Sequence, residues 1–209
     1  MQATIKLFPR LQKSNYFLVL LLLNLFLLTL AFVFYNGAFL FWQYPLSYLG
    51  HAFSYAEGLP NSISRIIYGL SMFSSGVVML LLGLRYRALM TKKLDWPKYV
   101  LCMVAALGFF VASFSPDDTV HLAHVLGSAC FAFSLWLLAT VELYDIRVYL
   151  GRFRHVMLQF MLQIPAIYYA FTYFADIAPL NYIVQKFAFL CLIVALAYVC
   201  FVDAPADKS

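Results

Sequence analysis

The stretch Ser115-Pro116-Asp117-Asp118-Thr119-Val120-His121-Leu122-Ala123-His124 decides how this sequence is interpreted, because it places ionisable side chains at the start of a long apolar run. At 100° per residue, Asp117, His121 and His124 lie at about 0°, 40° and −20° around a helix, so they share one narrow face. Carboxylate and imidazole are ligands that zinc and related metals use. Because ionisable groups inside a membrane span are costly, this face is a candidate functional site.

The same stretch also has a purely structural interpretation. Ser115-x-x-Asp118 matches a capping box, Pro116 suits the first helical position, and aspartates favour the positive end of a helix. This interpretation predicts a helix that begins at Pro116 and explains both aspartates without any function. It leaves His121 and His124 unexplained.

The composition predicts an all-α polytopic membrane protein. The 209 residues are 65% hydrophobic and only 11% charged, which is too little charge for a soluble domain of this size. Six apolar runs are long enough to span a bilayer, at about 16–35, 61–84, 97–114, 116–143, 155–174 and 181–202. We therefore expect a single transmembrane bundle of six helices over residues 1–209, with no separate soluble domain.

The basic residues predict the orientation of this bundle, because Lys and Arg gather on the cytoplasmic side. An N-terminus and C-terminus inside the cell put twelve of the fourteen basic residues on the inner side: Lys6, Arg10, Lys13, Arg85, Arg87, Lys92, Lys93, Lys98, Arg147, Arg152, Arg154 and Lys208. Topology thus explains the net charge of +5, and no nucleic-acid partner is expected. In a bacterium, the inner (plasma) membrane is the expected location.

Polar residues converge on the predicted outer side. His51 and Glu57 lie in the long aromatic loop at 42–61, and Asn61 is expected to cap the second span. Arg65 shares a predicted helix face with glycines at seven-residue spacing, so we expect it to point into the mouth of the bundle. It would there either pair with Asp117 or Asp118, or bind a phosphate or carboxylate group.

Lys186 also breaks the charge rule, near the outer end of the sixth span. It is either a second ligand for an anionic group or a side chain that extends to the headgroup region. In the fourth span, Gly127 and Ser128 continue the histidine face. Small residues there predict a close neighbouring helix, so the histidines should face protein.

Three motifs of this sequence resemble a known group of membrane proteins. These are Pro45-x-Ser47-x-x-Gly50 in the outer loop, Asn61 opening a span, and Pro116-x-Asp118 followed by histidine. Together they resemble the six-span families of largely unknown function that include DRAM/Sfk-type proteins. The Pro-to-Ser spacing is one residue shorter than in that pattern. The resemblance implies a six-helix bundle and a link to lipids, and it assigns no chemistry.

A second resemblance is to the alkaline ceramidase and adiponectin-receptor superfamily, membrane hydrolases that hold zinc with histidines. This chain differs in having six predicted spans rather than seven and His121-x-x-His124 rather than a wider pair. Fold-level analogy of this kind assigns no activity by itself.

Three functions remain open from the sequence. The first is an outward-facing site that binds or processes a lipid or lipid-linked substrate, with membrane lipids as partners and Ser47, Asn61, Arg65 and Lys186 as substrate-binding residues. The second is a metal-dependent hydrolase, in which Asp117, His121, His124 and His51 hold zinc as the cofactor and Asp118 or Glu57 acts as the base. The third is a non-catalytic accessory subunit of a larger membrane-protein complex.

Overall fold

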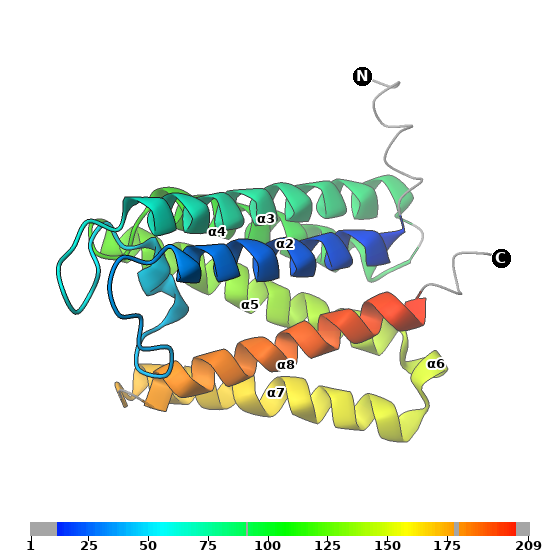
Figure 1. The fold of residues 1–209 in the computed structure, drawn as a ribbon. Helices are drawn as coiled ribbons and strands as arrows, with labels where there is room; N and C mark the ends of the chain where they lie inside the picture. Colours follow the sequence, from blue (N-terminus) through cyan, green and yellow to red (C-terminus); the bar gives the residue numbers. More distant parts are fainter. Residues whose placement is uncertain (1–11, 91, 178–179, 204–209) are drawn as a thin grey trace.

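The computed structural model describes residues 12–90, 92–177 and 180–203. Within these ranges the chain forms seven α-helices and one 3-10 turn, and it contains no strand. The elements are α2 (Lys13–Val33), η2 (Leu46–Gly50), α3 (Ser62–Leu89), α4 (Asp95–Phe114), α5 (His121–Asp145), α6 (Arg147–Leu150), α7 (Arg152–Phe174) and α8 (Leu180–Asp203). The predicted all-helical class is therefore confirmed for the described residues (Figure 1).

Five of the helices are long and apolar enough to cross a membrane: α2, α3, α4, α5 and α8. Helix α7 has 23 residues, a length that also suffices, but its sequence is less apolar than that of the other five. Arg152 and Arg154 in its first turn and Gln159 and Gln163 further along account for this difference. The chain is thus a helical membrane bundle.

The helices form two packed groups that contact each other. Helices α2, α3, α4 and α5 pack in chain order, and α7 and α8 form a hairpin that contacts α2 and α5 (Figure 1). Helices α4 and α5 approach most closely where Gly108 meets Gly127, because a Cβ at Gly108 would lie 2.6 Å from the carbonyl oxygen of Gly127. Small residues at such a crossing let two membrane helices pack backbone to backbone.

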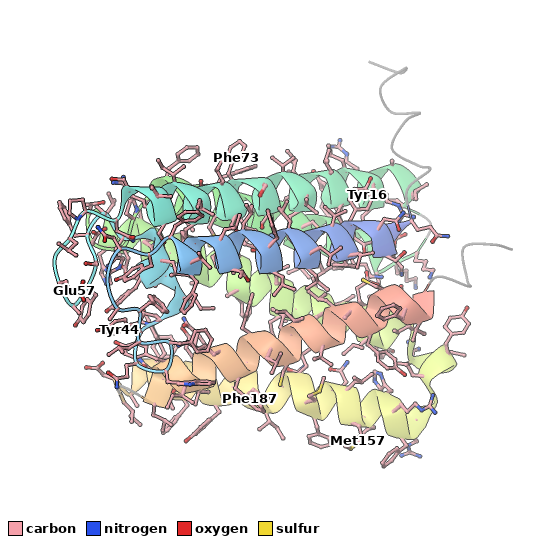
Figure 2. All side chains as sticks on the ribbon, in the orientation of Figure 1. Tyr16, Tyr44, Glu57, Phe73, Met157 and Phe187 are labelled. Atoms are coloured by element: carbon pink, nitrogen blue, oxygen red, sulfur yellow. The ribbon has the colours of Figure 1, made fainter. Side chains whose placement is uncertain are left out.

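The sides of the bundle carry large apolar side chains. Phe73 on α3, Met157 on α7 and Phe187 on α8 point outward from their helices and are exposed (Figure 2). An apolar exterior of this extent suits contact with lipid tails rather than with water.

The predicted start of the fourth span at Pro116 is wrong. Helix α5 begins at His121, and residues 115–120 form a turn without helical structure. The hydroxyl of Ser115 donates back to the carbonyl oxygen of Val111, and the carboxylate of Asp118 accepts hydrogen bonds from the outer loop. The capping box does not form, because both of its side chains have other partners.

Candidate functional site

The outer loop is fastened to the ends of the helices by two of the motif residues. Oδ2 of Asp118 accepts hydrogen bonds from the backbone N–H groups of Ala52, at 2.7 Å, and Phe53, at 3.3 Å. On the other side, Nδ2 of the buried Asn61 donates to the carbonyl oxygens of Leu49, at 3.3 Å, and His51, at 3.2 Å. Asn61 therefore positions the loop, and the predicted side-chain cap on α3 is not formed.

The 3-10 turn η2 sits directly on α3. The hydroxyl of Ser64 donates to the carbonyl oxygen of Leu49 at 2.8 Å, and a Cβ on Gly50 would lie 2.4 Å from the ring of Tyr68. A residue larger than glycine would therefore force the turn and the Tyr68 ring apart. Ser47 lies on this turn and is half-buried.

These contacts bring His51 next to the turn that precedes α5. Oδ1 of Asp117 lies 2.6 Å from Nδ1 of His121, and Oδ2 lies 3.6 Å from Nε2 of His51. The nearby imidazole of His51 and the hydrogen bond from His121 outweigh burial and lower the pKa of Asp117 to about 2. Asp117 is therefore an ionised carboxylate held between two imidazole rings.

The tautomers of the two α5 histidines follow from the groups beside them. An ionised carboxylate only accepts, so Nδ1 of His121 carries the proton and donates to Asp117. A carbonyl oxygen also only accepts, so Nδ1 of His124 donates to the carbonyl oxygen of Ser115 at 2.7 Å. In both neutral rings Nε2 is left as a hydrogen-bond acceptor.

The two rings differ in burial. The side chain of His121 is 76% exposed, whereas His124 is only 4% exposed, and its buried Nε2 has no hydrogen-bond partner among the described residues. The expectation that both histidines face protein is thus correct for His124 and wrong for His121, which stands at the solvent-facing end of the helix. Nε2 of His124 therefore keeps unused hydrogen-bonding capacity.

Arg65 does not join this site. Its side chain is exposed, and within the described ranges it makes no ion pair with Asp117 or Asp118. The reason is geometric. Gly69 packs against Ser113 in the last turn of α4. Arg65 lies one turn further out on α3, where α4 has already ended. The predicted ion pair of Arg65 with Asp117 or Asp118 is therefore not formed, and its role in binding an anion stays a prediction.

Glu57 lies at the tip of the outer loop (Figure 2). Its Oε1 accepts a hydrogen bond from the backbone N–H of Ala38 at 3.3 Å, and its carboxylate packs against Gly37. Glu57 is thus engaged with the segment that follows α2, whereas Asp118 is engaged with the loop backbone. Neither carboxylate is hydrogen-bonded to a histidine in the part of the chain described.

Lys186 binds the loop rather than an open site. Its Nζ donates to the carbonyl oxygen of Tyr44 at 2.7 Å and to that of Tyr182 at 3.1 Å, and it lies over the ring of Phe41. The residue is buried. Lys186 therefore connects α8 to the outer loop, and the expected extension to the headgroup region is not observed.

A surface groove of about 490 Å³ borders the loop. It lies between the end of α2 and the start of α3, and its lining includes Phe34, Ile63 and Asn61. Asn61 also donates to the carbonyl oxygen of His51, so the groove adjoins the loop that carries His51. Apolar side chains beside polar ones make the groove amphipathic.

The described residues contain no group of three His, Cys, Asp or Glu side chains arranged to hold a metal ion. His51 and His121 approach Asp117 from different sides, and His124 is bound to a backbone carbonyl through Nδ1. The predicted four-ligand set is therefore not assembled as a zinc site in these residues, since zinc needs three or four converging ligands.

A second polar cluster, at the opposite end of the bundle, was missed by the sequence interpretation. Glu142 of α5 is fully buried and accepts a hydrogen bond from Tyr86 at 2.5 Å, with Lys13 at 3.2 Å and Lys98 at 3.0 Å. Lys98 also bonds Asp145 at 2.6 Å. The signal was available, since two acidic residues three apart end an otherwise apolar span, but the lysines were attributed to topology alone.

Comparison of the chain with family models, with curated proteins and with solved structures gave no match. The resemblance to DRAM/Sfk-type proteins therefore stays a prediction, and function has to be argued from the site itself.

Proposed function

We propose that the chain is a six-span integral membrane protein with both termini in the cytoplasm, in which α7 is the additional span. The observation in favour is that the loop with His51 and the turn with Asp117 lie at the end opposite to the Lys- and Arg-rich turns (Figure 1). In a bacterium this membrane is the inner one. Labelling from outside should modify Glu57→Cys and spare Lys92→Cys, and the reverse pattern would refute this topology.

We propose that the outer site binds the polar headgroup of a membrane lipid or lipid-linked substrate. The observation that carries this function is the ionised Asp117 between His51 and His121, next to a buried Nε2 of His124 that has no partner. The aromatic loop above it suits the headgroup region, and the adjoining groove suits an acyl chain.

The chemistry of the site selects the kind of headgroup. The carboxylate of Asp117 accepts hydrogen bonds, and so does Nε2 of His121 or His124 when the ring is neutral. The site therefore favours a ligand that donates hydrogen bonds. Hydroxyl groups and a protonated amine meet this requirement. A phosphate, which only accepts when ionised, does not, since Lys186 is committed to the loop and the exposed Arg65 makes no ion pair with Asp117 or Asp118.

The Asp117–His121 pair also has the geometry of a proton acceptor. The carboxylate orients the ring through Nδ1 and leaves the exposed Nε2 available to accept a hydrogen bond. A headgroup hydroxyl bound there would be polarised toward loss of its proton. The site therefore has the groups needed to process a headgroup as well as to bind it.

Lipid retention tests this function. Purified protein should bind phosphatidylethanolamine, whose amine donates, more tightly than phosphatidylcholine, whose quaternary amine cannot, as counted by native mass spectrometry. Asp117→Asn and His121→Gln should abolish this preference, whereas the loop-tip control Glu57→Gln should keep it. Equal binding of both lipids by the unchanged protein, together with equal binding of hydroxyl-bearing phosphatidylglycerol, would refute the proposal.

No observation on the described residues favours the metal-dependent hydrolase over this function. The accessory-subunit function stays a prediction, and membrane lipids are the partners that the site supports.

A further inference from the structure

The corner between α5 and α7 carries exposed basic and exposed apolar side chains side by side. We call residues 147–155 the α6 corner. Its arginines are all exposed: Arg147, Arg152 and Arg154. Between them lie Val148, Tyr149 and Phe153, which are 79%, 68% and 77% exposed. Basic heads interleaved with large apolar side chains are typical of a segment at a membrane surface.

The corner is held rigidly enough to form a defined surface. Ile146 and Leu150 are buried and attach α6 to the bundle. The guanidinium of Arg147 lies 3.7 Å from the centre of the Tyr144 ring and donates to the carbonyl oxygen of Tyr144 at 2.7 Å. Gly151, with φ of +71°, then makes the sharp change of direction into α7.

Among the described residues, no acidic side chain pairs with the exposed arginines of the corner. The acidic residues at this end of α5, Glu142 and Asp145, are occupied by lysines. Arg152 and Arg154 make no ion pair within the described ranges, and the first turn of α7 contains no acidic residue. Two arginines in the first turn of a helix oppose its dipole, so this arrangement favours an added anion.

Two further groups at the corner favour an anion. Helix α7 begins at Arg152, and its N-cap residue, Gly151, provides no side-chain cap, which leaves backbone N–H groups of the first turn available. In addition, the buried Nδ1 of His155 has no hydrogen-bond partner in the described part of the chain. These groups are donors or can become donors, in contrast to the acceptors of the outer site.

We propose that the α6 corner binds the anionic phosphate headgroup of a phospholipid in the leaflet at this end of the bundle. Arg152 and Arg154 contact the phosphate, and Val148, Tyr149 and Phe153 enter the acyl-chain boundary beside it. The occupant is a lipid rather than a soluble phosphate because the apolar side chains would otherwise be exposed to water. This inference does not depend on the outer headgroup site, which lies at the other end of α5.

The test uses full-length protein in a neutral detergent, with phosphatidic acid or phosphatidylcholine added and bound lipid counted by native mass spectrometry. R152Q/R154Q should bind phosphatidic acid about tenfold more weakly, since each basic residue near a membrane surface adds several-fold to anionic lipid binding. R87Q/K93Q removes the same charge at the same end of the bundle and should change binding less than twofold. R152K/R154K should retain most of the affinity.

Thermal unfolding of each variant checks that the fold is kept, and Asp117→Asn checks that the outer site is not involved. Equal losses in R152Q/R154Q and R87Q/K93Q would overturn the proposal, because binding would then follow net charge only. Unchanged binding in R152Q/R154Q would overturn it as well and would leave the exposed corner to a protein partner. Displacement by millimolar inorganic phosphate would contradict a lipid occupant.

Discussion

The two ends of α5 each carry a cluster of charged residues, and the clusters differ in how completely they are satisfied. At the inner end, Glu142 is fully buried and bonded to Tyr86, Lys13 and Lys98. At the outer end, Asp117 is flanked by imidazoles, and a buried nitrogen of His124 has no partner among the described residues. The charged groups around Glu142 are all paired within the protein, whereas the cluster around Asp117 keeps a nitrogen that can still form a hydrogen bond.

This difference separates a structural role from a binding role. The inner cluster joins α2, α3, α4 and α5 through side chains that all have partners, so it has nothing left to offer a ligand. The outer cluster is assembled from the loop, the α4–α5 turn and α5. Its His121 ring is exposed, and the buried Nε2 of His124 has no partner among the described residues. Burial and charge alone would not have distinguished the two.

The largest expected effect is at the inner end. Glu142→Ala leaves Lys13 and Lys98 buried with one partner fewer, and removing one member of a buried charge cluster costs about 3–5 kcal/mol of the free energy of unfolding. Chemical unfolding in detergent measures this loss. Glu57→Ala, at the loop tip, is the matched control and should cost far less. A similar stability for the two variants would contradict a structural role for the inner cluster.

A smaller effect is expected where Asp118 fastens the outer loop. Asp118→Ala removes the acceptor for the N–H groups of Ala52 and Phe53, and hydrogen bonds to a charged group contribute about 1.5–3 kcal/mol each at most. Hydrogen exchange at Ala52 and Phe53 should accelerate, while exchange in the middle of α5 stays unchanged. Unchanged exchange at both loop amides would mean that Asp118 does not hold the loop.

The smallest expected effect is the pH dependence at Asp117. Its pKa is lowered from 3.8 to about 2, so the stability that it contributes is present above pH 4 and is lost as the pH falls toward 2. Asp117→Asn should therefore lower stability at neutral pH and flatten the acid side of the stability curve. Thermal unfolding between pH 7 and pH 3 checks this, and parallel curves for the two proteins would contradict the proposed pairing.

The sequence predicted the membrane bundle well because apolar run length is a strong local signal. Five of the six predicted spans correspond to helices apolar enough to cross a membrane, and the remaining one, at 155–174, corresponds to α7. The start of α5 could not be predicted in this way. Asp118 binds loop amides up to 66 positions away in the chain, and such a contact overrides the local capping signal.

The candidate site was predicted in part. Asp117 does contact His121, and His51 does meet Asp117, because a loop after one span and a turn before another lie at the same end of a bundle. His124 instead binds the carbonyl oxygen of Ser115, since residues 115–120 are not helical. The partners of Arg65 and Lys186 depend on where α4 ends and on where the loop folds back onto α8. The periodicity of the sequence carries no information on either point. Glu142 and Asp145 were visible as acidic residues at the end of an apolar span, but their pairing with lysines of α2 and α4 follows only from the packing of the helices.

The most direct measurement of the central claim is the response of the imidazole rings to lipid, followed by NMR with ¹⁵N-labelled histidine. Addition of phosphatidylethanolamine should shift the ring nitrogens of His121 and His124 at the outer end. The Asp117→Asn variant is the control and should respond much less, because it lacks the carboxylate that orients the His121 ring. Shifts of equal size in Asp117→Asn, or none at His121 and His124 in the unchanged protein, would contradict a headgroup site built around Asp117.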